Sequence, residues 1–474
     1  MRRIRTIFLA SAAGLALASA AHAQSAGSNS VWLDQLDSGQ QFSATQSGAN
    51  NRVGSSAATR FRQSAGSVIG ATGNTATITQ GGTGNILGWQ NNDGQDLPAN
   101  RTSSFQAGSN NQATATQNGN NGRANLGQTG TDNTATLTQG ANVNGALMFL
   151  SQNGSNNSAN LGQGAGGATG TGITGAGGSL VVTTVTQTGT WNAAITNQNG
   201  TGNAYITIGQ SNSNGANASQ VNTATATQTG ATNESSIGIS QFNGNSNTAT
   251  ATQTGGANSS AIQQWGTGNT ATTTQTAAAS NALANAITIN QGRTLTADVV
   301  GTQNGVDGRR SFSAGDDSFA LSTSSQFTGF QSGAQNTIQA TQMGLQQVAF
   351  FTQTGVNNWI FSRQANSGNQ ATTTQTGNAN TSNQTQIGVN GFASIDQNSN
   401  TNLLNMTQDV GSTLARLTAQ QYGGGQNVIA SYQGAGNDNR AEVYQGTLGG
   451  TAIANLTDLR QSGNGNRLTV NQNR

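Results

Sequence analysis

The chain has 474 residues, of which only 7% are charged and 5% aromatic, and it contains 66 Gly, one Pro and no Cys. Much of the 32% hydrophobic fraction is Ala, so the sequence excludes a disulfide-stapled domain and an ordinary globular core of large apolar side chains. The low net charge of +2, the abundant Thr, Asn and Gln and the near-absence of Pro exclude a highly charged disordered chain and favour stacked β-structure.

Residues 1–23 are predicted to be a secretory signal peptide. The basic start MRRIRT precedes the apolar stretch IFLASAAGLALASA, and the A-x-A motif that ends at Ala23 predicts cleavage between Ala23 and Gln24. Because the three Arg residues of MRRIRT leave with this segment, 14 basic residues remain against 15 acidic ones, and the processed chain lacks the positive charge typical of nucleic-acid binding. No other stretch approaches the ~20 apolar residues that a membrane-spanning helix needs.

Residues 24–45 form an N-terminal segment before the regular part of the chain. The segment contains SVWLDQLDSGQQF, which is rich in large apolar residues for this sequence. Two interpretations stay open: a cap on the first coil of a repetitive fold, or a targeting segment that export machinery recognises.

A repeat of eleven residues dominates the rest of the chain. Its unit is Q-x-G-x-x-N-x-A-x-x-x-Q, as in QTGTDNTATLTQ (128–139) and QWGTGNTATTTQ (264–275). We divide the repeats into three blocks, 46–163, 183–291 and 327–474, within which insertions of one or two residues fall at turns. The Gln positions that carry the spacing are Gln106, Gln117, Gln128, Gln139, Gln152, Gln163, Gln187, Gln198, Gln264, Gln275, Gln331, Gln342, Gln353, Gln364, Gln375, Gln386, Gln397 and Gln408.

The spacing inside each unit predicts a strand followed by a turn. Asn, Ala and Gln stand at even steps and therefore share one face of a strand, whereas the residues between them are often Thr. The x-G-x-x segment predicts the turn, in which Gly supplies a positive φ. The inward Asn positions are Asn133, Asn157, Asn192, Asn269, Asn336, Asn358, Asn369 and Asn380.

A single strand-turn unit cannot be stable, but stacked units can be. Two units per flattened coil, with coils ~4.8 Å apart, would stack identical amides so that they hydrogen-bond along columns. We therefore predict an all-β fold: a β-solenoid of strand-turn-strand coils with amyloid-like cross-β order and ladders of Gln and Asn. Outward apolar residues such as Phe350 and Phe361 either cover one another or form a lateral contact surface.

Two stretches interrupt the repeats. Residues 164–182 are Gly-rich and predict a flexible joint between two blocks. Residues 292–326 contain the densest charge cluster of the processed chain, and we interpret them as a solvated insertion rather than a site for calcium or an anionic partner.

The repeat unit, as it stands in residues 128–139, 152–163 and 264–275, resembles that of curlins, the subunits of bacterial curli fibres. The resemblance covers most of 42–163, 183–291 and 327–474. It implies a subunit that outer-membrane machinery exports unfolded and that then polymerises on the cell surface, alone or with other curlin-like subunits, into a functional amyloid for adhesion and biofilm matrix. The chain has many more repeats than familiar curlins and lacks the Gly-rich N-terminus of the major subunit, so the roles of major subunit and nucleator both stay open.

Enzymatic activity does not fit this composition. The processed chain has no His, Lys or Cys and few acidic residues, so we expect no catalytic site, no cofactor, no metal site and no small-molecule substrate.

The alternative function is a soluble extracellular solenoid that binds ice or carbohydrate. Outward Thr in TATITQ (75–80), TATATQ (223–228) and TATTTQ (270–275) resemble the ranks of ice-binding β-solenoids. We expect Trp359, Phe361 and Arg363 to interrupt these ranks and to make a poor flat lattice.

Overall fold

The computed structural model describes residues 22–23, 29–36, 39–54, 60–64, 73–88, 104–141, 145–164, 181–199, 204–212, 221–229, 235–242, 244–255, 258–276, 285–291, 322–323, 325–423, 426–446 and 455–472. Most of the predicted signal peptide, Gln24, and most of the Gly-rich joint and of the charged insertion lie outside these residues. Within the described part, no helix is long and apolar enough to cross a membrane.

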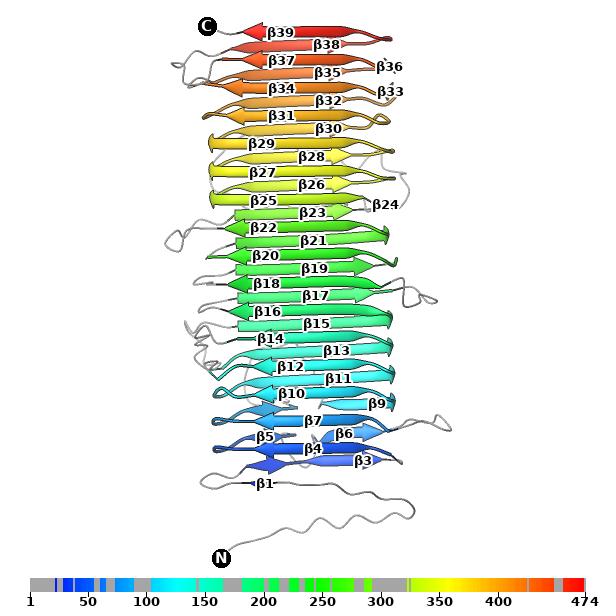
Figure 1. The fold of residues 1–474 in the computed structure, drawn as a ribbon, viewed down its shortest axis with the longest axis vertical. Coiled ribbons are helices and arrows are strands. Elements are labelled where there is room, and N and C mark those ends of the chain that lie inside the picture. Colours follow the sequence, from blue (N-terminus) through cyan, green and yellow to red (C-terminus); the bar gives the residue numbers. More distant parts are fainter. Residues whose placement is uncertain are drawn as a thin grey trace, which may run out of the picture.

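The described chain is a parallel β-solenoid, as predicted (Figure 1). Each coil places one strand, or two short ones, in each of two sheets, and every strand pairs in parallel with its equivalent in the next coil. Sheet A, with 17 strands, runs through β1 (His22–Ala23), β4 (Gln41–Gln46), β7 (Thr75–Gln80), β10 (Gln112–Gln117), β12 (Thr134–Gln139), β14 (Ser158–Gln163), β16 (Asn192–Asn199), β18 (Asn222–Thr229), β20 (Thr248–Thr254), β22 (Thr270–Thr276), β25 (Gln326–Ala334), β27 (Val348–Val356), β29 (Gln370–Asn378), β31 (Phe392–Asn398), β34 (Arg416–Tyr422), β37 (Arg440–Gln445) and β39 (Arg467–Gln472).

Sheet B lies opposite sheet A. It runs through β2 (Ser30–Val31), β3 (Leu33–Leu36), β5 (Arg52–Val53), β6 (Phe61–Ser64), β8 (Ile86–Leu87), β9 (Phe105–Ser109), β11 (Arg123–Thr131), β13 (Leu147–Ser155), β15 (Val181–Thr190), β17 (Ala204–Ser211), β19 (Ser235–Phe242), β21 (Asn258–Thr267), β23 (Asn285–Gln291), β26 (Thr337–Gln342), β28 (Trp359–Gln364), β30 (Thr381–Gln386), β32 (Leu403–Gln408), β35 (Val428–Gln433) and β38 (Leu456–Gln461). Short strands outside the two sheets are β24 (Ser322–Thr323), which pairs with β21, and β33 (Ser412–Thr413), which pairs with β36 (Gly436–Asn437).

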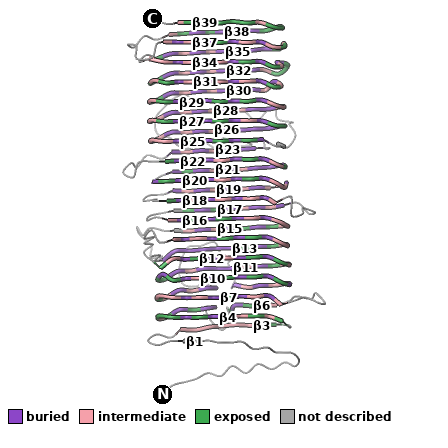
Figure 2. Tube along the Cα trace, viewed as in Figure 1, coloured by how far each residue is buried: buried purple, intermediate pink, exposed green. Residues whose placement is uncertain are grey.

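Alternation along each strand builds a thin core between the sheets. In β12 the side chains of Ala135, Leu137 and Gln139 are buried, whereas the Thr residues between them are exposed or half-buried. Figure 2 shows the same alternation of buried and more exposed residues along the stack. Because Ala, Ile and Leu at these positions stack in register, one column of small apolar side chains supports the next, as the parity of the repeat predicted.

The turns use two left-handed residues where the sequence pattern predicted only Gly. In the turn before β12, Gly130 has φ +109° and Asp132 has φ +57°. The second position recurs directly before the inward Asn of other units, as at Asn156, Asn357 and Ala379. Asn tolerates this conformation better than most residues, which explains the N-N pairs in the sequence.

The stack passes both interruptions without a change of register. On either side of the Gly-rich joint, β13 pairs with β15 and β14 with β16, and the Gln of each strand stays opposite the Gln of its partner. On either side of the charged insertion, β22 pairs with β25 and β23 with β26 in the same way. Both interruptions fall between the end of one strand and the start of the next, so the pairing of the flanking strands is kept.

Candidate self-assembly site

The inward Gln of each strand hydrogen-bonds to its equivalents in the neighbouring coils. Gln353 is fully buried; its Nε2 donates to Oε1 of Gln375 at 2.8 Å and to the carbonyl of Thr337 at 3.1 Å. Its Oε1 accepts from Nε2 of Gln331 at 2.8 Å. Both N–H groups and the carbonyl of this amide are therefore used, which matters because a buried unsatisfied group costs about 1–3 kcal/mol.

Repetition of this contact makes two Gln columns that run the length of the solenoid. The sheet A column contains Gln46, Gln80, Gln117, Gln139, Gln163, Gln198, Gln228, Gln253, Gln275, Gln331, Gln353, Gln375, Gln397, Gln421, Gln445 and Gln472. The sheet B column contains Gln35, Gln63, Gln106, Gln128, Gln152, Gln187, Gln210, Gln241, Gln264, Gln291, Gln342, Gln364, Gln386, Gln408, Gln433 and Gln461. In every one of these contacts the Gln nearer the N-terminus donates.

All the Gln residues that the sequence spacing selected lie in these columns. Successive repeat units lie in opposite sheets, so Gln342 and Gln353, neighbours in the spacing, belong to different columns and the bonded partner is the second Gln along. The two columns hold 32 Gln residues, and 14 of them lie outside the 18 selected positions. One of these is Gln35, which begins the sheet B column inside the N-terminal segment. Its signal was the distance of eleven residues to Gln46.

The inward Asn residues form shorter columns with the opposite direction. Asn133 donates from Nδ2 to Oδ1 of Asn111 at 3.0 Å and to the carbonyl of Gly154 at 2.9 Å, so here the residue nearer the C-terminus donates. Of the predicted positions, the following stand at the starts of sheet A strands: Asn133, Asn157, Asn192, Asn269 and Asn369. The remaining ones stand at the starts of sheet B strands: Asn336, Asn358 and Asn380.

Not every predicted Asn touches another Asn side chain. Asn369 donates to the carbonyls of Ala365 at 2.6 Å and Gly388 at 2.9 Å, and its Oδ1 accepts from the backbone N–H of Gly391 at 2.8 Å. The Asn at this position therefore stabilises the turn through these carbonyls and also links its coil to the next one through its Oδ1. Where the next coil carries Gly instead, the backbone N–H takes the place of the amide.

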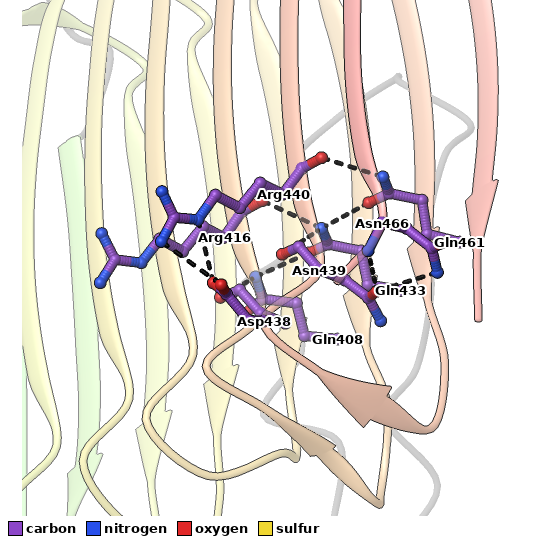
Figure 3. Close-up of polar contacts among 9 residues, drawn as sticks. Gln408, Arg416, Gln433, Asp438, Asn439, Arg440, Gln461 and Asn466 are labelled. Atoms are coloured by element: carbon purple, nitrogen blue, oxygen red, sulfur yellow. Dashed lines mark hydrogen bonds and ion pairs between the residues drawn. The ribbon is translucent and has the colours of Figure 1, made fainter. Parts of the chain in front are cut away.

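The same contacts continue near the C-terminus (Figure 3). Gln408 donates to Gln433 and Gln433 to Gln461, each at 2.9 Å, while Asn466 donates to Oδ1 of Asn439 at 3.0 Å.

The repeat family is visible in the middle of the stack. The family model of the Curlin associated repeat matches residues 222–255 and 244–276. Residues 222–276 are curlin-associated repeats. No curated protein shows a significant match to the chain. The matched segment spans β18 to β22. Its Gln–Gln and Asn–Asn hydrogen bonds are of the same kind as those in the coils before and after it.

The solenoid leaves its inner surface partly open at both ends. At the C-terminal end, formed by β38 and β39, the inward Leu468 is 39% exposed and the neighbouring Val470 is half-buried. At the N-terminal end, formed by β2, β3 and β4, the inward Val31, Leu33 and Phe42 are only partly buried. In the described chain, β1 is the only strand beyond β4. β1 belongs to the predicted signal peptide, so the predicted cleavage after Ala23 would remove it.

Among the residues that the structure describes, charged side chains lie mainly toward the two ends of the solenoid. Between residues 133 and 395, the described part of the chain has a single charged side chain, Arg363. Exposed ion pairs join Arg60 to Asp34 at 2.7 Å near the N-terminal end and Arg440 to Asp438 at 2.9 Å near the C-terminal end. Exposed pairs of this kind contribute only about 0–1 kcal/mol, so they do not hold the stack together.

Two Tyr–Asp contacts lie outside the core near the C-terminal end. The Tyr422 hydroxyl donates to Asp396 at 2.8 Å, and burial, followed by this hydrogen bond and the negative charge of Asp396, raises the pKa of Tyr422 to about 12. The Tyr432 hydroxyl donates to Asp409 at 2.6 Å, and that bond is the main cause that raises the pKa of Tyr432.

Outward Thr residues form a regular array on one sheet only. In β18, β20 and β22 the outward side chains are all Thr and stand in register in four columns. The expectation that Trp359, Phe361 and Arg363 interrupt these ranks is wrong, because β28 lies in sheet B whereas the Thr array lies in sheet A. The described residues contain no group of His, Cys, Asp and Glu side chains that could hold a metal ion.

Proposed function

We propose that this chain is a secreted structural subunit that polymerises with itself into curli-like amyloid fibres at the cell surface, supporting adhesion and biofilm matrix. The observation that carries the proposal is the state of the two ends: both Gln columns and both sheets stop with strand edges and inward apolar side chains open. The open end of a second copy can pair with these edges in the way that a further coil of the same chain would.

The remaining parts of this proposal follow from the family. The predicted signal peptide supports secretion, and the curlin-associated repeats support outer-membrane export and nucleation machinery as partners and co-polymerisation with other curlin-like subunits. The product is the structure itself, so we propose no enzymatic reaction, no cofactor, no nucleic-acid partner and no small-molecule substrate.

Polymerisation of the purified processed chain tests the proposal. We expect thioflavin-positive fibres after a lag that added seeds shorten, with a fibre diffraction spacing of about 4.7–4.8 Å along the axis. Combined replacement of Gln342, Gln353, Gln364 and Gln375 by Leu should slow assembly. The matched control replaces the outward Thr341, Thr352, Thr372 and Thr374, which lie on the same two sheets, by Ser. A chain that stays monomeric under every condition would refute the proposal.

Binding of ice or carbohydrate by the Thr array of sheet A is the second candidate. The observation in its favour is the in-register array of outward Thr in β18, β20 and β22, which the exposed Ile195 and Phe330 border on the neighbouring strands without interrupting it. Thermal hysteresis of the soluble monomer, and retention on insoluble polysaccharide, would support this candidate. Fibres without either activity would contradict it.

A further inference from the structure

We propose that copies join head to tail in a single register, with β38 and β39 of one copy under β2, β3 and β4 of the next, so that sheet A continues as sheet A and sheet B as sheet B. This inference rests on the proposed self-assembly and specifies its polarity and its junction.

The winding of the chain permits such a junction without a gap. Without β1, which belongs to the predicted signal peptide, the stack begins in sheet B with β2 and β3 and ends in sheet A with β39, and the two Gln columns contain the same number of residues. The solenoid therefore consists of whole coils. A following copy, which again begins in sheet B, takes the position that the next coil of the same chain would occupy.

The direction of the amide bonds distinguishes the two ends. Because the amides of both Gln columns donate toward the C-terminus, Gln461 and Gln472 are the donors at the C-terminal end. One N–H of each amide donates to a backbone carbonyl, that of Arg440 for Gln461 and that of Leu456 for Gln472. In the described chain no Gln follows them to accept from the second N–H. At the N-terminal end, the matching acceptors are Oε1 of Gln35 and of Gln46, whose own Nε2 atoms already donate into the stack.

The Asn columns, which run the other way, give the same polarity. At the C-terminal end, Asn466 donates into the stack and its Oδ1 is the acceptor for a following coil. At the N-terminal end, Gln40 stands at the Asn position: its Oε1 accepts from the backbone N–H of Asn74 at 3.1 Å, while its Nε2 is buried without a hydrogen-bond partner. Placed over Asn466 of the preceding copy, Gln40 would find the missing acceptor.

Apolar and charged side chains match in the same register. Counted back from the column Gln, Leu468 lies over Phe42 of the next copy, and Leu459 over Leu33. Leu468, Leu33 and Phe42 are inward side chains that the ends leave partly open, whereas Leu459 is buried. The outward residue directly before the column Gln is Arg460 at one end and Asp34 at the other.

The register with the sheets exchanged loses the charge match. Arg460 would then lie over Thr45, and Asp34 over Asn471. A tail-to-tail junction would oppose the Gln461 and Gln472 donors of one copy to the same donors of the other. Only the head-to-tail register with like sheets aligned pairs donors with acceptors and Arg460 with Asp34.

Disulfide trapping tests the register, because the chain has no Cys of its own. Neighbouring parallel strands lie about 4.7–4.9 Å apart, within the range of Cα separations that a disulfide spans. The test variant carries Thr45→Cys and Asn471→Cys, two exposed outward positions of sheet A. Fibres of this variant, grown under reducing conditions and then oxidised, should yield a ladder of disulfide-linked multimers on denaturing gels.

Two controls separate the possible junctions. Asp34→Cys with Asn471→Cys links copies only if the sheets are exchanged, and Asn471→Cys alone gives linked dimers only if copies meet tail to tail. We expect fewer than a tenth of the multimers of the test variant from either control. Equal or stronger linkage in a control would overturn the inference while leaving self-assembly intact, whereas absence of fibres from the unmodified chain would instead remove the proposed function.

The charge match has its own measurement. Arg460→Glu should slow elongation on seeds of the unmodified chain about two- to fivefold at low salt, and high salt should abolish the difference. Arg363→Glu, in the same sheet but far from both ends, is the matched control and should leave elongation unchanged. Equal slowing by both variants would contradict the Arg460–Asp34 contact.

Discussion

Substitution of neighbouring Gln residues should show that the columns act as continuous chains of hydrogen bonds. Gln353→Leu leaves two buried groups without their partner: the Nε2 of Gln331, which donated to Gln353, and the Oε1 of Gln375, which accepted from it. At about 1–3 kcal/mol for each unsatisfied group, the single substitution should cost about 2–6 kcal/mol of stability. The outward neighbour Thr352→Ser should cost less than about 0.5 kcal/mol.

Pairs of substitutions make the prediction sharper. Replacing Gln375 as well removes the Oε1 atom that Gln353→Leu had left without a donor. The adjacent pair therefore again leaves two unsatisfied groups, the Nε2 of Gln331 and the Oε1 of Gln397. The adjacent pair should therefore cost about as much as one substitution. Replacing Gln353 and Gln397 together leaves four unsatisfied groups and should cost about twice as much, about 4–12 kcal/mol.

Urea unfolding of the dilute monomer, followed by far-ultraviolet circular dichroism, measures the overall change, and hydrogen exchange of the β25–β31 amides measures the local one. The ratio between the two double variants is the decisive quantity, because each variant replaces two buried Gln by two Leu. Equal costs for the adjacent and the separated pair would refute continuous columns, as would a Gln353→Leu variant no less stable than Thr352→Ser.

Two further predictions concern the turns and the outer surface. Gly355 has φ +119°, and an added Cβ would collide with the carbonyl oxygen of Gly377, so Gly355→Ala should destabilise the chain by more than about 2 kcal/mol in urea unfolding. Gly238→Ala is the control: nothing lies near the added Cβ, so this substitution should be neutral or stabilising. Equal effects of the two substitutions would contradict the turn geometry. Because the pKa of Tyr422 is raised from 10.0 to about 12, the stability that its hydrogen bond contributes is fully present below about pH 10 and is lost as the pH rises toward 12. Tyrosinate absorbance should show a late-titrating Tyr, which Asp396→Asn shifts to lower pH and which the outward substitution Thr418→Ser does not.

Periodicity alone was enough to predict the strands, their inward faces and the amide columns. The reason is that parity within a strand is a local property: Ala135 and Leu137 must share a face with Gln139 whatever the rest of the chain does. A stack of identical amides is also the arrangement in which so many buried Gln residues can all find partners. The left-handed residue before the inward Asn escaped the pattern, because Asp132, Asn156 and Ala379 differ in type and share only a backbone conformation.

Only the tertiary structure decided which repeats touch and which surfaces coincide. The spacing of Gln342 and Gln353 does not reveal that they lie in opposite sheets, and for that reason Trp359 was expected among Thr ranks from which the whole core separates it. The sheet to which a strand belongs depends on how many strands precede it along the solenoid. Insertions change the sequence distance between strands without changing that number. The direction of the hydrogen bonds is likewise a property of the folded stack, since an amide in isolation is equally able to donate either way along its column.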